Sequence, residues 1–181
     1  MSRLATLDDG ERLDDTELRV TALLVIGAGF ETTVNLVDNA AVLLLAHREQ
    51  LAAVRAEPSG WPNVVEEVLR HDSPVQATDT EVAGVAIPRG RFVSIMIGGA
   101  NRDPDVFPEP QRFDVTRPNA REHLAFSAGV HYCLGAGLAR MEATVGLRAL
   151  FERFPDLALD GMSRRRQMRV LHGYESVPVR V

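Results

Sequence analysis

The chain has 181 residues, a length that supports one domain with a buried core. Hydrophobic residues make up 45% of it and charged residues 25%, as in ordinary soluble globular proteins. The net charge of −5 argues against nucleic acid as a general partner, and the one basic run, residues 163–166 (SRRR), is expected to be a solvated loop. A single cysteine excludes an internal disulfide and fits a reducing cytoplasm. Glu31 and Asp38 interrupt the longest apolar runs, so we predict no membrane span.

The N-terminal part of the chain predicts one long helix. Asp14 can cap the backbone, and Glu17, three residues later, completes a capping-box pattern. From there to about Ala46 the sequence has no proline and is rich in alanine, leucine and valine. We therefore expect a helix of about 30 residues, apolar on most sides and mostly buried.

Two shorter helices are predicted next, over roughly 48–56 and 62–71. Residues 58–60 (PSG) separate them, and Pro62 suits the first turn of the later helix. Pro74 is expected to end the helical region, because the residue before a proline disfavours helix.

The second half of the chain predicts less regular structure. Residues 75–97 alternate in the manner of β-strands, and residues 84–97 (GVAIPRGRFVSIMI) predict a hairpin with its turn at 88–90. Residues 101–135 are proline-rich and predict no regular element, and such long segments are usually functional or disordered. A last helix is expected over about 135–154, followed by a terminal hairpin within 169–181. The fold class is mainly α with a small β component.

The first unusual feature is the sequence GAGFETT at residues 27–33, inside the apolar helix. Each glycine there costs up to about 1 kcal/mol relative to alanine, and a charged residue costs more unless it has a partner. Tight helix packing around a paired Glu31 would explain the pattern. Alternatively, the helix opens locally so that a flat ligand approaches the backbone, and Glu31 beside Thr32 forms a proton-delivery pair.

The second feature is a charged pair at helical spacing. Glu67 and Arg70 are three residues apart and share a helix face. An ordinary surface ion pair would have the same pattern, and Glu109 and Arg112 repeat it in the proline-rich segment. The pair alone is therefore a weak indication.

The third feature is the lone Cys133 in the glycine-rich segment 125–137. A thiolate is a soft metal ligand when backbone N–H groups and a helix N-terminus stabilise its charge. A buried structural cysteine would fit a helix or strand better than this loop, and a structural zinc site would need four ligands. Nucleophilic catalysis with His131 as the base stays open on these residues alone.

Taken together and in this order, these segments resemble the cytochrome P450 family of haem-thiolate monooxygenases. Residues 126–135 (FSAGVHYCLG) match F-x-x-G-x-H-x-C-x-G, the family's most specific motif. Residues 28–32 (AGFET) match A-G-x-[DE]-T, residues 67–70 (EVLR) match E-x-x-R, and residues 110–113 (PQRF) match P-x-R-F. The resemblance implies that residues 1–181 are a single partial haem-thiolate domain. It would be the C-terminal part of the P450 fold, with its long central helix, E-x-x-R helix, cysteine-ligand loop and final long helix.

The resemblance implies a haem b cofactor held by the motif residues. Cys133 would be the axial thiolate ligand of the iron, a ligand that favours O–O cleavage. His131 would reach a haem propionate, and Phe126 would pack near the thiolate and shield it. The other residues that the resemblance places against the haem are small: Ala28, Gly29, Gly129 and Gly135.

The resemblance also implies roles for the charged and hydroxyl residues. Glu31 and Thr32 would be the catalytic pair that relays protons during oxygen activation. Glu67, Arg70 and Arg112 would form a buried charge cluster that holds the cysteine loop without touching substrate. Removing one member of such a cluster leaves an unpaired buried charge and costs about 3–5 kcal/mol.

The implied activity is insertion of one oxygen atom of O2 into a small organic substrate, in the cytoplasm, with a ferredoxin- or flavodoxin-type electron donor. The family's N-terminal portion is absent, and the segment after Pro74 is shorter than usual and lacks an expected arginine. The alternative is therefore a non-catalytic haem-binding or helper protein, and a complementing N-terminal segment or a partner enzyme would complete the pocket. A cysteine hydrolase leaves the helix and E-x-x-R motifs unexplained. Loss of the pocket roof predicts exposed apolar faces on the long helix.

Overall fold

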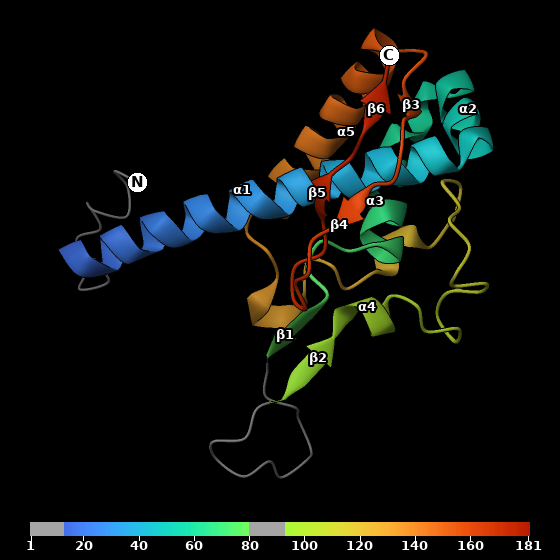
Figure 1. Cartoon of the computed structure of the whole chain (residues 1–181). Helices are drawn as coiled ribbons and strands as arrows, with labels where there is room; N and C mark the ends of the chain where they lie inside the picture. The colour runs from blue at the N-terminus through green and yellow to red at the C-terminus, as the bar shows by residue number, and fades with distance from the viewer. Residues whose placement is uncertain (1–12, 80–92) are drawn as a thin grey trace.

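The structure is a computed structural model that describes residues 13–79 and 93–181. Within these residues the longer helices are close to those that the sequence predicts: α1 (Asp15–Ala46), α2 (Arg48–Ala56), α3 (Trp61–His71) and α5 (Ala136–Arg153). Figure 1 shows α1 as a long rod whose C-terminal half is surrounded by the other helices, while its N-terminal half extends away from them.

The start of α1 confirms the predicted capping box. The Asp14 carboxylate accepts hydrogen bonds from the backbone N–H groups of Thr16 at 2.7 Å and Glu17 at 2.8 Å. The Glu17 carboxylate accepts the Asp14 N–H at 2.8 Å in return. Together these bonds satisfy backbone donors that have no partner within the first turn.

The hydrophobic core lies where the C-terminal half of α1 meets α3 and α5. Leu36 and Leu44 of α1, Val68 of α3 and Leu147 of α5 are all buried in this cluster. Burial of α1 is confirmed only for this half, because its buried residues all lie between Asn35 and Leu45.

The N-terminal half of α1 is apolar but exposed. Leu23, Ile26 and Phe30 are each about 70% exposed (72%, 69% and 73%). This agrees with the exposed faces expected from loss of the pocket roof. By length and composition alone, α1 could cross a membrane, although a core helix of a soluble protein passes the same test.

Short antiparallel strand pairs complete the described structure. Strand β1 (Ala77–Asp79) pairs with β2 (Ser94–Met96) in the antiparallel sense. The first strand of the predicted hairpin, residues 84–87, and its turn at 88–90 lie outside the described residues. The short helix α4 (Ile97–Ala100) follows β2 directly.

The predicted C-terminal hairpin is wrong. Strand β5 (Tyr174–Ser176) pairs with β4 (Arg164–Arg165), whereas β6 (Val179–Arg180) pairs with β3 (Ala158–Leu159). Only Val177 and Pro178 separate β5 from β6. This connection has no glycine to reverse the chain, and the Pro178 carbonyl accepts the Asp160 N–H at 2.9 Å.

The basic run at 163–166 is also not a free loop. It contains β4, and two of its arginines form ion pairs with acidic residues far away in the sequence. Arg165 pairs with Asp72 at the end of α3, and Arg166 pairs with Glu31 of α1 at 3.0 Å. These ion pairs attach the C-terminal strands to the helices.

Candidate functional site

The cysteine loop is a closed turn directly before α5. The Cys133 N–H donates to the Phe126 carbonyl at 2.9 Å, which joins the two ends of the loop. Ser127 and Gly129 have left-handed backbone angles, with φ of 61° and 60°. Gly129 adopts this conformation without the strain that a side chain brings, whereas Ser127 adopts it with its side chain. The motif thus folds into a fixed turn, although the segment lacks long regular elements.

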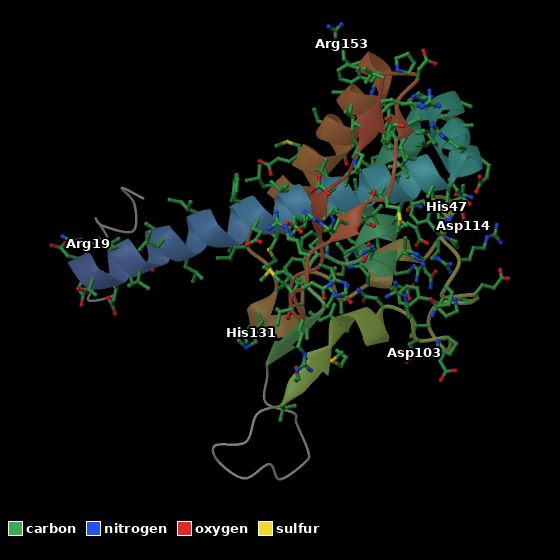
Figure 2. The ribbon with its side chains drawn as sticks, in the orientation of Figure 1. Arg19, His47, Asp103, Asp114, His131 and Arg153 are labelled. Carbon is green, nitrogen blue, oxygen red and sulfur yellow. The ribbon has the colours of Figure 1, made fainter. Side chains whose placement is uncertain are left out.

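The Cys133 thiol lies on the exposed outer side of this loop. Beside it, Val130 is 97% exposed and Leu134 is fully exposed. Figure 2 shows His131 at the outer edge of the same loop, pointing away from the helices. A thiol that lies among outward-facing apolar side chains is typical of a surface that binds an apolar partner or ligand.

The glycine-rich part of α1 is a regular α-helix, so the expected local opening is wrong. The Thr32 hydroxyl donates to the Ala28 carbonyl at 2.6 Å, one helical turn earlier. A Cβ placed on Gly27 or Gly29 would meet nothing within 4 Å. Tight helix packing therefore does not explain these glycines among the described residues. Instead, they leave the backbone accessible from outside the helix.

The predicted acid of the proton-delivery pair has a cationic partner. The Glu31 carboxylate lies 3.0 Å from the Arg166 guanidinium, and both side chains are more than a third exposed. The structure therefore places Glu31 and Thr32 next to one another on α1, with Glu31 in contact with solvent and with the C-terminal segment.

The predicted pair Glu67 and Arg70 is completely buried on α3. Arg70 donates from Nε and Nη2 to the two Glu67 carboxylate oxygens, each at 2.7 Å. Its Nη1 donates to the carbonyls of Asn101 at 3.1 Å and Pro110 at 2.9 Å. Because each donor nitrogen of this guanidinium has a partner, the pair holds α3 against the proline-rich segment.

The second arginine of the cluster is Arg117, and the prediction that the Arg112 side chain lies there is wrong. The Arg112 side chain is 58% exposed and reaches only Glu109 and Asp114, at 3.4 Å and 3.9 Å. The Arg117 Nε lies 3.2 Å from the Glu67 carboxylate instead.

The reason lies in the local chain direction. Phe113 occupies the core side of the segment, so the side chain of Arg112 before it points to solvent. Arg112 contributes its backbone carbonyl, which accepts hydrogen bonds from Arg70 and Arg117, both at 3.1 Å.

A second buried carboxylate, Glu66, was not predicted from the sequence. It accepts hydrogen bonds from the Arg140 Nε at 2.8 Å and from the His123 Nε2 at 3.0 Å. Burial alone would raise the pKa of Glu66, but the hydrogen bonds from His123 and Arg140 and the charge of Arg140 outweigh it and lower the pKa from 4.5 to about 2. No local pattern in the sequence marks Glu66, because its partners His123 and Arg140 lie 57 and 74 residues away.

The side chains at this site could supply one ligand, the Cys133 thiolate, to a haem iron. Within residues 13–79 and 93–181 no group of three or more His, Cys, Asp or Glu could hold a metal ion. A site built from side chains alone is therefore not found there, whereas an iron that takes its other ligands from a porphyrin needs only one thiolate here. In the same part of the chain no hydrogen bond joins His131 to Cys133, so the pairing that a cysteine hydrolase needs is not found.

Comparison with known proteins shows the family to which this fold belongs. The family model for cytochrome P450 matches residues 61–169, more than half of the chain. The chain belongs to the cytochrome P450 family.

Individual relatives cover nearly all of this chain. It is 57% identical to cytochrome P450 140 of Mycobacterium tuberculosis, over 95% of this chain and 41% of that protein. It is 47% identical to 6-deoxyerythronolide B hydroxylase of Saccharopolyspora erythraea, over 96% of this chain and 45% of that protein. The structure of the cytochrome P450 PksS of Bacillus subtilis 168 superposes with a TM-score of 0.89 at 36% identity, over 98% of this chain and 48% of that one. The chain thus spans less than half the length of these three proteins.

Proposed function

We propose that this chain is a haem-thiolate protein of the monooxygenase class, which holds haem b through Cys133. The observation that carries the proposal is the exposed Cys133 thiol, on a closed loop and one turn before the N-terminus of α5. The last helix begins at Ala136, so Cys133 lies three residues before a helix N-terminus. When bound, haem supplies the redox chemistry that activates O2.

The residues around the thiol have supporting roles in this proposal. Phe126 shields the thiolate from the protein side, and His131 contributes an N–H group toward a propionate. Gly29 and Ala28 would let a haem approach the backbone of α1, because Gly29 has no side chain, Ala28 has only a methyl group, and a Cβ on Gly29 would meet nothing within 4 Å. Gly129 supplies the left-handed turn of the loop, with φ of 60°, and Gly135 lies next to the thiol, since a Cβ there would stand in ordinary contact, 3.9 Å from the Cys133 sulfur.

Glu31 and Thr32 are proposed to move protons between solvent and the reacting substrate. The Thr32 hydroxyl uses its hydrogen for the Ala28 carbonyl, so its oxygen is available to accept a further hydrogen bond. The half-exposed Glu31 carboxylate can exchange protons with water. Insertion of one oxygen atom into a small organic substrate would then require this pair and a ferredoxin- or flavodoxin-type electron donor.

The chain is proposed to act in the cytoplasm together with a complementing N-terminal segment or a partner enzyme. The exposed apolar residues on the N-terminal half of α1, among them Leu23, Ile26 and Phe30, support this proposal. The same exposure favours the second candidate function, a non-catalytic haem-binding or helper protein derived from a cytochrome P450. The two differ in whether substrate is oxidised once the complementing segment is supplied.

Haem binding is tested by incubating the purified chain with haemin, reducing it and adding carbon monoxide. A strongly red-shifted Soret band is expected, and Cys133→Ser should abolish it. His131→Gln is the matched control, since it should weaken haem retention but keep the thiolate spectrum. If Cys133→Ser binds haem as the unchanged chain does, or if His131→Gln alone removes the axial ligand, the assignment of Cys133 is wrong.

A further inference from the structure

The two ends of the cysteine loop are connected to one buried carboxylate, that of Glu66 on α3. One connection runs through His123, which precedes the loop, and the other through Arg140 of α5, which follows it. Glu66 is 1% exposed and His123 is equally buried, while Arg140 lies at the edge of the protein at 28% exposed. Because Glu66 is buried and contacts residues at both ends of the cysteine loop, its hydrogen bonds restrict the loop conformation more than an exposed ion pair would.

His123 connects Glu66 to the beginning of the loop. The Ala125 N–H donates to the His123 Nδ1 at 3.1 Å, so Nδ1 is the acceptor and the ring proton lies on Nε2. That proton is donated to the Glu66 carboxylate at 3.0 Å. The ring also packs against Phe126, with centroids 5.8 Å apart. The imidazole thus fixes the backbone at 125 and the side chain at 126.

Arg140 connects Glu66 to the end of the loop. It donates from Nε at 2.8 Å and from Nη2 at 3.2 Å to the two Glu66 oxygens, and from Nη1 to the Tyr132 hydroxyl at 3.2 Å. Its guanidinium also lies 4.5 Å from the centre of the Phe126 ring. Phe126 is therefore packed between an imidazole and a guanidinium that share one carboxylate, and its carbonyl accepts the Cys133 N–H.

We propose that Glu66, acting through His123 and Arg140, is a positioning residue that sets the place of the Cys133 thiolate. The four residues Glu66, His123, Phe126 and Arg140 are called the loop anchor below. This inference rests on the proposed function, because its purpose is to present the sulfur to haem iron. The loop anchor touches neither the iron nor the substrate in this proposal, and it is distinct from the Glu67 cluster on the neighbouring position of α3.

The test uses Arg140, because its partial exposure makes a substitution tolerable for folding. Arg140→Met removes the bidentate bond and the contact with Tyr132, whereas Arg140→Lys keeps the charge without the planar fork. The matched control is Arg148→Met, because Arg148 lies on the same helix and pairs with an exposed acid, Glu152, at 2.7 Å. All measurements use the full chain.

The first readout is amide hydrogen exchange without haem. Arg140→Met should raise exchange of residues 124–134 roughly ten- to a hundredfold, the opening expected on loss of charged hydrogen bonds, and leave α3 unchanged. Arg140→Lys should lie between, and Arg148→Met should have no effect on the loop. Equal exchange of this loop in all variants, or the same increase in α3 as in the loop, would overturn the positioning role.

The second readout is the spectrum of the haemin-loaded, reduced chain with carbon monoxide. Arg140→Met should lower the share of the red-shifted thiolate Soret band in favour of an unshifted band, and Arg140→Lys should partly restore it. An unchanged share in Arg140→Met would overturn the inference that the loop anchor sets the thiolate. If the unsubstituted chain shows no thiolate band, the proposed function fails, while the exchange measurement still decides whether Glu66 holds the loop.

Discussion

Replacement of Arg117 should destabilise the protein far more than replacement of Arg112, although only Arg112 belongs to a recognisable motif. The Arg117 side chain is 6% exposed and the Glu67 carboxylate is fully buried, with 3.2 Å between the closest atoms. Arg117 also donates to the carbonyls of Pro108 at 2.7 Å and Glu109 at 3.3 Å. Arg117→Ala removes the donor of these two backbone carbonyls and one of the two cations that pair with the buried Glu67.

The magnitudes follow from burial. Loss of one member of a buried charge cluster costs about 3–5 kcal/mol, and the value should lie at the lower end because Arg70 still neutralises Glu67. Arg112→Ala removes a side chain that is 58% exposed and paired with an exposed acid, so about 0.5 kcal/mol or less is expected. The Arg112 carbonyl, which does take part in the cluster, is unchanged by that substitution.

Urea unfolding followed by far-ultraviolet circular dichroism measures both effects as shifts of the transition midpoint. Arg117→Lys keeps the charge but not the fork, and it should fall between the two alanine variants. This variant also keeps the comparison possible if Arg117→Ala does not fold. Equal destabilisation by Arg112→Ala and Arg117→Ala would refute the reasoning, because it would place the Arg112 guanidinium in the cluster.

Two further predictions concern pH and the exposed helix. Burial, followed by the charges of Arg102 and Arg70, lowers the pKa of His71 from 6.5 to about 4. The folded state therefore favours neutral His71. The resulting contribution to the free energy of unfolding is complete above pH 6.5 and is lost as the pH falls toward 4. Glu66, with its pKa lowered to about 2, adds a loss between pH 4.5 and 2, and each group contributes at most about 3 kcal/mol. Urea midpoints should therefore fall from pH 7 to 5 to 3, and a midpoint that does not change would contradict both assignments. Phe30→Glu, on the exposed face of α1, should reduce self-association in sedimentation velocity without lowering the urea midpoint, and a large loss of stability would show that this face is buried.

The helices could be predicted because their signals are local. Asp14 and Glu17 cap α1 through bonds that span three residues, and Pro62 starts α3 at a position where a missing N–H has no cost. The bounds of α2, Arg48–Ala56, agree with the prediction for the same reason. The strand pairs of the C-terminal region could not be predicted in this way. Strands β5 and β6 pair with the earlier strands β4 and β3, and the sequence of a strand does not indicate which other strand it pairs with.

The charge clusters could be predicted only where both partners lie on the same helix. Glu67 and Arg70 share a helix face, so their pairing follows from spacing alone. The third partner comes from an irregular segment, where the direction of each side chain depends on which neighbour fills the core. Phe113 fills it here, so Arg112 faces solvent and Arg117 reaches inward. Glu66 has its partners His123 and Arg140 at 57 and 74 residues' separation, and no local pattern marks such a contact.

The two halves of α1 show how far composition can mislead about burial. Both halves are rich in apolar residues, yet only the half beyond Asn35 meets α3 and α5. The exposed half also carries Gly27 and Gly29, each of which weakens an unsupported helix by roughly 1 kcal/mol relative to alanine. Neither glycine contributes to packing among the described residues, so their cost is offset only if something flat contacts the backbone there. A ligand bound between Gly29 and the Cys133 loop would supply that contact, and it would bury apolar surface that otherwise favours aggregation.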